Sequence, residues 1–264
     1  MLAIIRGAGD IASAIALRLH KCGASVIMTE AEHPLTVRRT VAFSEAVRSG
    51  KTQVEGVVGI RAESADDALR RALEGVIPVL VDPECSCIWL EPDVLVDAIL
   101  AKRNVGTAID MAPIVIGIGP GFTAGDDCHA VVETMRGHTL GRVYYEGSAL
   151  PNTAVPGLVG GFAGERVLRA PNDGTFREVA SIRDHVEAGQ AVAYVDDAPV
   201  IATLTGTLRG LLAGGTHVTK GLKCGDIDPR DEVSHCETVS DKGLAVAGGV
   251  LEAILHLSDT LTKA

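Results

Sequence analysis

A glycine-rich turn, Gly7-Ala8-Gly9-Asp10-Ile11-Ala12, follows the apolar run 2–6 near the start of the 264-residue chain. Apolar residues then recur with helical spacing over 11–19, and a second apolar run, 25–29, ends at Glu30. A strand, a tight glycine turn, a helix and a second strand occur in this order in the nucleotide-binding βαβ unit. The segment therefore predicts a Rossmann-like α/β domain.

The residues of this turn have the properties that a dinucleotide site needs. Gly7 permits the tight bend, Gly9 lets the backbone approach a pyrophosphate, and Ala12 lets the helix pack closely. Glu30 can accept hydrogen bonds from ribose hydroxyls, and the N–H groups at the helix start attract phosphate. The predicted cofactor is a nucleotide, NAD(P), FAD or ATP, or a molybdopterin-type cofactor. The alternative is a doubly wound sheet that needs glycine at the turn and binds nothing there.

Two further segments extend the predicted site. Pro34 can begin an amphipathic helix that carries Arg38 and Arg39, of which at most one can face a cleft. The pair forms either a solvated face or an anion clamp for a ribose 2′-phosphate or a pterin phosphate. A second glycine turn, 117–121, can also present N–H groups to an anion. The predicted cofactor-binding residues are Gly7, Gly9, Asp10, Ile11, Ala12, Glu30, Arg38, Gly119 and Gly121.

Strand and helix patterns continue to alternate through the first part of the chain. Strands are predicted at 54–60, 77–81, 93–99 and 114–118, and a helix with a capping box at 64–73. Hydrophobic residues make up 47% of the chain but aromatic residues only 3%, so the core must consist of aliphatic side chains. The alternation predicts a mostly parallel sheet whose ligand cleft lies at the carboxyl ends of its strands.

The last hundred residues contain an internal repeat with an offset of 32 residues. Gly174-Thr175-Phe176 matches Gly206-Thr207-Leu208, His185-Val186 matches His217-Val218, and Gly189 matches Gly221. The pattern resembles the biotinyl and lipoyl carrier fold, a flattened β-barrel-sandwich hybrid. No lysine lies between Lys102 and Lys220, so the hairpin that joins the halves cannot carry a cofactor covalently. The module is predicted to be structural or to recognise a partner.

The chain is thereby divided into three parts. Residues 1–160 are predicted to form the Rossmann-like α/β domain, and residues 165–235 the barrel-sandwich domain without a carrier lysine. The apolar pattern over 241–257 predicts a helix, so that residues 236–264 return to pack on the first domain.

Two polar groups outside the glycine turns are further candidates for a ligand site. The first, Glu133, Arg136 and His138, is either an ion pair on one helix turn or a polar cluster at the sheet edge. The second follows the repeat, where Asp226 and Asp228 alternate to one face of an extended segment. It could hold a cation, form an interface ion-pair network or bind a polar ligand. These candidates are Glu133, Arg136, His138, Lys223, Asp226, Asp228 and Arg230. No metal site and no catalytic residue is predicted.

Charge and cysteine content restrict the partners and the compartment. The formal net charge of −10 disfavours nucleic acid and anionic membranes. The six cysteines include no C-x-x-C pair, which predicts free thiols in a reducing cytoplasm. No signal segment or membrane span is evident in the sequence. The oligomeric state is not predicted.

Six motifs occurring together resemble the YqeB-type accessory proteins of selenium-dependent molybdenum hydroxylase systems, which are distantly similar to xanthine dehydrogenase accessory factors. The motifs are Gly7-Ala8-Gly9-Asp10-Ile11-Ala12, Met28-Thr29-Glu30, Val37-Arg38-Arg39, Gly119-Pro120-Gly121-Phe122, Glu133-Thr134-Met135-Arg136-Gly137-His138 and Gly225-Asp226-Ile227-Asp228-Pro229-Arg230.

The resemblance implies a maturation factor for a selenium-dependent molybdenum hydroxylase, with the hydroxylase apoprotein as partner and a nucleotide or molybdenum-cofactor-like ligand in the Rossmann cleft. It transfers no catalytic residues. The alternative is an NAD(P)-dependent oxidoreductase, for which only His138 or His129 could donate a proton at the cleft. Whether the chain is an enzyme stays open at this point.

Overall fold

The computed structural model describes residues 1–258, which fall into two compact units. Unit 1 comprises Met1–Pro34, Ala42–Thr153 and the segment from Val239 onward, and unit 2 comprises Leu35–Val41 and Ala154–Thr238. The prediction placed all of residues 1–160 in the first domain. The structure instead assigns the short segment Leu35–Val41 to unit 2. Residues 259–264 of the predicted third part lie outside the described residues.

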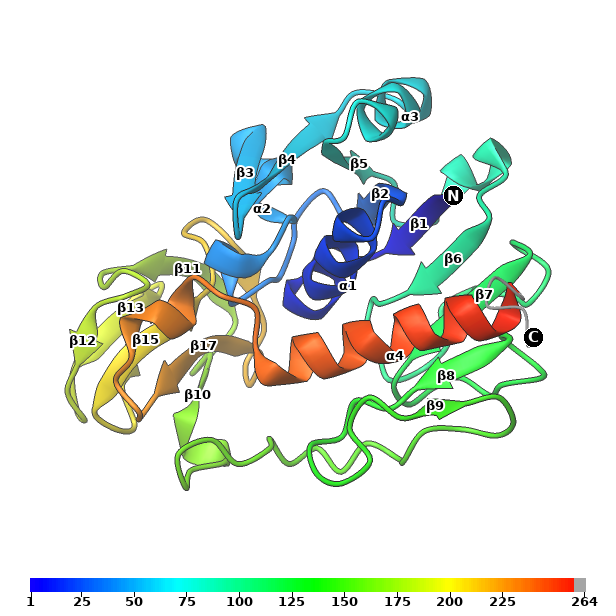
Figure 1. Cartoon of the computed structure of the whole chain (residues 1–264). Helices are drawn as coiled ribbons and strands as arrows, with labels where there is room; N and C mark the ends of the chain where they lie inside the picture. The colour runs from blue at the N-terminus through cyan, green and yellow to red at the C-terminus, as the bar shows by residue number, and fades with distance from the viewer. Residues whose placement is uncertain (259–264) are drawn as a thin grey trace. The chain divides into compact units, whose positions relative to one another are not determined.

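The strands of unit 1 form one nine-stranded sheet within the described residues, in the order β3-β4-β5-β2-β1-β6-β7-β8-β9 (Figure 1). The strands from β4 to β8 are parallel, whereas β3 and β9 run antiparallel to their neighbours. Their bounds are β1 (Leu2–Arg6), β2 (Ser25–Glu30), β3 (Lys51–Val54), β4 (Val57–Ala62), β5 (Ile77–Val81), β6 (Val94–Asp97), β7 (Ile114–Ile118), β8 (Ala130–Val132) and β9 (Val143–Tyr144).

Four α-helices accompany this sheet in the part of the chain that is described: α1 (Asp10–Lys21), α2 (Glu45–Ser49), α3 (Ala65–Leu73) and α4 (Asp241–Leu257). Helix α4 packs along α1, as Figure 1 shows. A side chain at Gly243 would bring its Cβ to 2.8 Å from the Cβ of Ala14, so glycine permits this close approach. Helix α4 is too short to cross a membrane, and no other helix within residues 1–258 qualifies.

Unit 2 contains two four-stranded antiparallel sheets, β10-β17-β15-β12 and β14-β13-β11-β16. The repeat explains their pairing, because β12 of the first half pairs with β15 of the second, and β16 of the second half pairs with β11 of the first. The bounds are β10 (Val167–Arg169), β11 (Gly174–Glu178), β12 (His185–Val186), β13 (Ala191–Val195), β14 (Ala198–Ile201), β15 (Gly206–Leu211), β16 (His217–Val218) and β17 (Lys223–Asp228).

The core of unit 2 consists of apolar side chains from both halves, including Phe176, Val192, Leu208 and Ile227, all fully buried. Short 3₁₀ turns complete the unit: η1 (Arg39–Val41), η3 (Gly164–Arg166) and η4 (Val233–Cys236), whereas η2 (Ser86–Leu90) belongs to unit 1.

The predicted fold class is wrong in both of its parts. The large sheet is mixed, and no helix follows β6 or β7, where a Rossmann-like fold would place crossover helices. The connections there contain Pro113, Gly119, Pro120 and Gly121, which disfavour helix. Unit 2 has two separate small sheets and no clear biotinyl-type barrel-sandwich.

Two local predictions also changed. The helix expected from Pro34 onward is instead the turn η1 and the short helix α2, separated by Ala42–Ser44. The single strand expected over 54–60 is a hairpin of β3 and β4. Its turn residues Glu55 and Gly56 both have positive φ, the conformation of a tight two-residue hairpin loop.

Candidate functional site

The glycine turn and Glu30 meet at the carboxyl ends of the neighbouring parallel strands β1 and β2. Gly7 has a φ of +92°, and a Cβ there would lie 3.0 Å from the carbonyl oxygen of Ala98. Both observations require glycine. The Ala8 N–H donates to Glu30 Oε2 at 2.9 Å, and the Ala31 N–H donates to Oε1 at 2.8 Å. The carboxylate is therefore fixed against the turn.

The hydrogen bonds of Glu30 leave acceptor capacity on both oxygens. A carboxylate offers about four lone-pair sites, and the two N–H groups use one on each oxygen. Burial raises the pKa of Glu30, although the hydrogen bonds from Ala31 and Ala8 oppose that shift. The remaining acceptors match the two hydroxyls of a ribose.

Helix α1 begins directly after the turn. Gly9 has an extended backbone and no side chain to cap the helix. Ser13 holds the turn from inside, since its Oγ donates to the Ala8 carbonyl at 3.1 Å and accepts the Phe43 N–H at 2.8 Å. Ile11 and Ala12 are buried, so their contribution to a ligand would come from the backbone. The positive end of the α1 dipole lies beside Gly9 and Asp10.

A buried ion pair that the sequence analysis did not identify lies at the same edge of the sheet. Arg6, at the end of β1, contacts Asp97, at the end of β6, at 3.3 Å, and both side chains are 2% exposed. Thr107 bridges them, accepting from Arg6 at 2.5 Å and donating to Asp97 at 2.6 Å. The sequence signal that could have indicated this ion pair is Arg6 itself, which ends the apolar run 2–6. A guanidinium buried with such a strand requires a charged partner.

Cys85 and Cys87 lie near this ion pair and are both buried. A hydrogen bond from Cys87 lowers the pKa of the Cys85 thiol; burial opposes this shift, and the charge of Arg6 supports it. The pKa of Cys87 is raised by the same contact and by burial. Within residues 1–258, no group of three histidine, cysteine or acidic side chains is arranged to hold a metal ion.

The second glycine turn is explained by packing within unit 1. A Cβ at Gly119 would lie 2.6 Å from Thr134 Oγ1, and one at Gly121 would lie 2.6 Å from the backbone of Arg103. Both glycines also have positive φ. Close packing against Thr134 and Arg103 therefore explains why both positions are glycine. A role of this turn in anion binding stays a prediction.

The candidates Glu133, Arg136 and His138 do not form one cluster. Glu133 is fully buried and accepts backbone N–H groups of residues 134, 135 and 150. Arg136 instead pairs with Asp241 of α4, and His138 is exposed. Since residues 133–138 are not helical, the expected ion pair on a helix turn is absent there.

Arg38 belongs to unit 2, where its guanidinium donates to the carbonyls of His235 at 2.9 Å and Thr238 at 3.1 Å. Arg39 donates to the Leu211 carbonyl at 2.9 Å. These bonds attach the segment Leu35–Val41 to unit 2. A role of Arg38 in an anion clamp stays a prediction.

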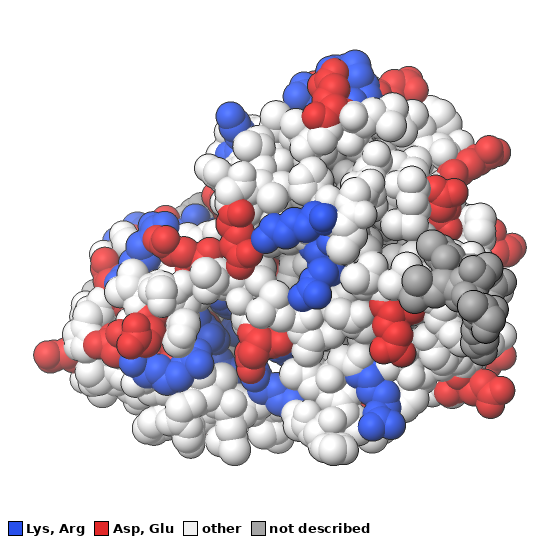
Figure 2. All heavy atoms as spheres, viewed as in Figure 1, with Lys and Arg blue, Asp and Glu red and all other residues white. Residues whose placement is uncertain are grey.

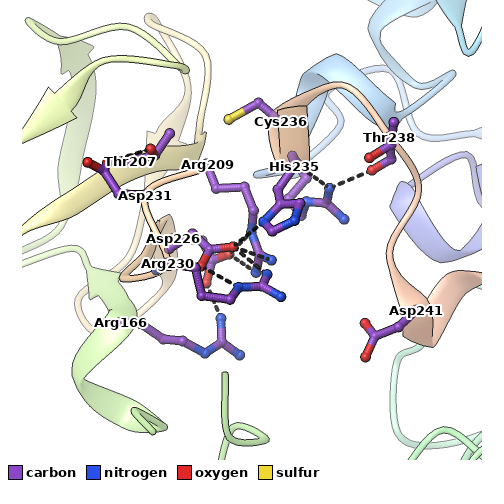
Figure 3. Close-up of polar contacts among 12 residues, drawn as sticks. Arg166, Thr207, Arg209, Asp226, Arg230, Asp231, His235, Cys236, Thr238 and Asp241 are labelled. Atoms are coloured by element: carbon purple, nitrogen blue, oxygen red, sulfur yellow. Dashed lines mark hydrogen bonds and ion pairs between the residues drawn. The ribbon is translucent and has the colours of Figure 1, made fainter. Parts of the chain in front are cut away.

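The second candidate group forms a buried ionic cluster in unit 2 (Figure 3). Asp226 is fully buried and accepts hydrogen bonds from Arg166 and Arg209, with the Lys223 ammonium 3.9 Å from its Oδ1. Asp228, also fully buried, accepts from Arg209 at 3.2 Å and from Arg230 Nη2 at 2.5 Å. Arg209 bridges the two carboxylates.

The cations around these carboxylates lower their pKa values. Burial by itself raises the pKa of Asp226, but the charges of Lys223, Arg209 and Arg166 outweigh it. Burial likewise opposes ionisation of Asp228, and hydrogen bonds from Arg230 keep its pKa below the ordinary value. Both aspartates are therefore charged at neutral pH. The sequence placed them on one face but did not identify Arg166 or Arg209.

No protein-family model matches the chain. It is 51% identical, over all 264 residues, to the Escherichia coli (strain K12) protein named "Uncharacterized protein YqeB". The match covers 49% of that protein, so the chain spans about half the length of this curated relative. The likeness supports the YqeB label, and nothing in it confirms a role with a selenium-dependent molybdenum hydroxylase.

Similar solved structures include an aspartoacylase family protein from Mesorhizobium loti and a succinylglutamate desuccinylase/aspartoacylase from Rhodobacter sphaeroides. The first is 10% identical and covers 86% of this chain and 84% of its own; the second is 16% identical and covers 85% and 86%. The TM-score is 0.25 for both, which is too low to transfer an activity.

These comparisons correct the functional prediction. The E. coli relative is named without a function, so the comparisons give the predicted maturation role no support. The maturation role is therefore not carried further. The oxidoreductase alternative is also set aside, because His138 is exposed and His129 Nδ1 accepts the Val115 N–H at 3.0 Å.

Proposed function

We propose, starting from the likeness to YqeB and from the geometry of unit 1, that the chain binds a nucleotide where β1 and β2 end. The ribose would lie on Glu30 and the phosphates at the start of α1. The observation that carries the proposal is the hydrogen bond between Glu30 Oε2 and the Ala8 N–H. It places a carboxylate with spare acceptors beside the turn that begins α1.

The charges of the two groups suit the two parts of a nucleotide. The amide groups at the start of α1 carry partial positive charge and favour phosphate. Glu30 would repel phosphate at close range, so it favours the neutral hydroxyls of the sugar. A nucleotide whose sugar and phosphate are adjacent satisfies both requirements. The predicted molybdopterin-type cofactor also carries a phosphate, but its pterin offers no ribose to Glu30.

The proposal is tested by calorimetric titration of the full chain with ATP, NAD⁺, NADP⁺ and FAD. At least one should bind with saturable heat, and Glu30→Gln should weaken that ligand by about tenfold to a hundredfold, because charged hydrogen bonds contribute about 1.5–3 kcal/mol each. Affinity should also fall as the pH drops through the raised pKa of Glu30, and Glu30→Gln should remove that dependence.

The matched control is Glu32→Gln, which removes the same charge from an exposed position two residues away. It should bind as tightly as the wild type. Circular dichroism establishes that each variant is folded. Absence of heat with all four nucleotides, or equal affinities of the Glu30 variant and wild type, would contradict the proposal. Mass spectrometry of small molecules released from the purified protein would identify a pterin instead.

The partner predicted from the resemblance, a molybdenum hydroxylase apoprotein, stays a prediction that no observation on this chain tests.

A further inference from the structure

The large sheet of unit 1 grows in opposite directions from its central strands β1 and β6. Strands β2 to β5 lie on one side of β1, and strands β6 to β9 lie on the other. In open sheets of parallel strands, ligands bind outside the carboxyl ends at such a point, between the loops that follow the two central strands. The glycine turn follows β1, and residues 98–107, the β6 loop, follow β6. A ligand held by the glycine turn is therefore expected to lie beside the β6 loop.

The β6 loop is attached to the end of β1 at two places. At its start, the Ala98 N–H donates to the Arg6 carbonyl at 2.9 Å, and a Cβ at Gly7 would lie 3.0 Å from the Ala98 carbonyl oxygen. Near its end, the Arg6 guanidinium donates to the Val105 carbonyl at 3.0 Å and to Thr107 Oγ1 at 2.5 Å. The loop therefore begins and ends beside β1.

The middle of the β6 loop carries two adjacent cations, Lys102 and Arg103. Three extended residues span at most about 11 Å, so the Cα of Lys102 lies within that distance of the Cα of Val105. The backbone of Arg103 packs on the second glycine turn, where a Cβ at Gly121 would lie 2.6 Å from it. The β6 loop thus runs from one glycine turn to the other, and both cations lie on that path.

Neither cation has an acidic partner. In the described part of the chain, residues 1–258, no hydrogen bond or ion pair involves the side chain of Lys102 or Arg103. The neighbouring acid, Asp127, accepts instead from the Asn104 side chain at 2.9 Å and from the Thr123 N–H at 2.8 Å. Both cationic side chains are exposed, yet burial lowers the pKa of Lys102. An ammonium that is accessible but incompletely hydrated gains more from an anion than a fully hydrated one.

The chain as a whole carries more acidic than basic residues. Aspartate and glutamate number 34 against 24 for lysine and arginine, and Figure 2 shows the two kinds interspersed over the visible face. Nonspecific attraction of anions is therefore weak. Saturable binding of a phosphate group would have to come from a local pair of cations without acidic partners, such as Lys102 and Arg103.

We propose that Lys102 and Arg103 bind the phosphate chain of the nucleotide, and that the ligand is a nucleoside triphosphate. This inference rests on the nucleotide site proposed above. Glu30, which would hold the ribose, ends β2, and the β6 loop follows the strand on the opposite side of β1. Adjacent strands are about 4.8 Å apart, so the ends of β2 and β6 are separated by about 10 Å. A sugar with a chain of phosphates can span this distance across the start of α1.

The two cations distinguish classes of nucleotide by charge. A nucleoside triphosphate ends in its most negative group, which Lys102 and Arg103 attract. The far end of NAD⁺ is a cationic nicotinamide, which the same side chains repel. A nucleoside monophosphate has no group that reaches beyond the start of α1. The β6 loop therefore favours a nucleoside triphosphate over both.

The test is calorimetric titration of the full chain with AMP, ADP and ATP, and separately with inorganic tripolyphosphate, in a buffer that contains a chelator of divalent cations. Affinity should rise by about tenfold or more from AMP to ATP, because the added phosphates gain charge-assisted contacts. Tripolyphosphate should compete with ATP and bind more weakly, since it lacks the sugar that Glu30 would hold.

Lys102→Gln and Arg103→Gln should each weaken ATP by about tenfold and leave the affinity for AMP unchanged. Glu30→Gln should instead weaken AMP and ATP by the same factor. Lys51→Gln is the matched control, because Lys51 is an exposed lysine of unit 1 on the edge strand β3, and it should bind ATP like the wild type. Circular dichroism establishes that each variant is folded.

Two results would overturn this inference while leaving the nucleotide site intact. One is equal affinity of the wild type for AMP and ATP, and the other is an ATP affinity of both Lys102→Gln and Arg103→Gln equal to that of Lys51→Gln. If no nucleotide binds, the nucleotide site fails and tripolyphosphate decides the role of the β6 loop. Saturable binding that Lys102→Gln weakens would then support phosphate binding by this loop, and absence of binding would refute it.

Discussion

Asp226→Ala is expected to lower the free energy of unfolding of unit 2 by about 3–5 kcal/mol, the cost of leaving buried charges without their partner. Arg166 and Arg209 both donate to this carboxylate, and their side chains are only 9% and 8% exposed. Arg209 keeps Asp228, but Arg166 would lose its bond to this buried carboxylate. Urea titration with hydrogen exchange of peptides covering β15 and β17 measures the loss.

The control for this experiment is Asp197→Ala, which removes an exposed aspartate from the same unit. Its effect should stay within about 0.5 kcal/mol, as is usual for surface positions. A loss of less than about 1 kcal/mol in Asp226→Ala would mean that the arginines find other partners or water, and the cluster would then contribute little to the stability of unit 2.

The same cluster predicts how stability depends on pH. The pKa values of Asp226 and Asp228 are lower in the folded state than the ordinary value of about 3.9. Their contribution is thus fully present above that value and is lost as the pH falls from about 4 toward the folded pKa. The peptides of β15 and β17 should lose protection in this range, and Asp226→Ala should show a smaller change.

Glu133→Gln is expected to destabilise unit 1 by about 3 kcal/mol. Oε1 of Glu133 accepts the N–H groups of Thr134 and Met135, each at 2.7 Å, and Oε2 accepts that of Leu150 at 2.8 Å. Glutamine has only one acceptor oxygen, so its NH₂ group would face at least one buried N–H. Hydrogen bonds to charged groups contribute about 1.5–3 kcal/mol each, and an unsatisfied buried donor adds a further cost.

Glu146→Gln provides the comparison, because Glu146 is exposed and lies in the same stretch of chain. Hydrogen exchange of peptides that include β8 and residues 148–151 should accelerate only in the Glu133 variant. If both variants are equally stable, the three backbone contacts would contribute nothing measurable. A folded Glu133→Gln that lost nucleotide binding would instead make Glu133 part of the ligand site.

The elements around the first glycine turn could be predicted because their signals are local. The apolar run ending at Arg6, the helix that begins at Asp10 and the strand that ends at Glu30 all occur where the sequence pattern places them. Periodicity of apolar residues reports which face of an element is buried, and glycine reports where the backbone bends. Neither signal reveals which strands become neighbours at the edges of a sheet.

The pairing of the repeat in unit 2 illustrates the same difference. The offset of 32 residues was visible in the sequence, and Gly174 and Gly206 indeed share an unusual φ of +150° and +153°. The exchange of β12 and β16 between the halves was not visible, since it depends on contacts between strands far apart in the chain. A resemblance to a barrel-sandwich hybrid was therefore a wrong inference from a correct repeat.

The sequence leaves Arg38 either on a solvated face or in an anion clamp beside the second strand. The structure instead bonds it to His235 and Thr238, about two hundred residues away. The partners of buried charges are equally hard to predict. Arg6 and Arg209 each lie in an apolar strand, and the sequence of that strand does not show which carboxylate will pair with the arginine.

The amino-acid sequence by itself determined the first turn, the helix after it, the acid at the end of β2, the repeat, and the common face of Asp226 and Asp228. Only the tertiary structure decided that the segment Leu35–Val41 joins unit 2, that Arg166 and Arg209 neutralise the two aspartates, and that Glu133 holds backbone amides. The physical reason is the distance along the chain over which each kind of interaction acts. Propensity and periodicity act over a few residues, whereas a buried charge is stabilised by whichever distant group the fold brings within about 3 Å of it.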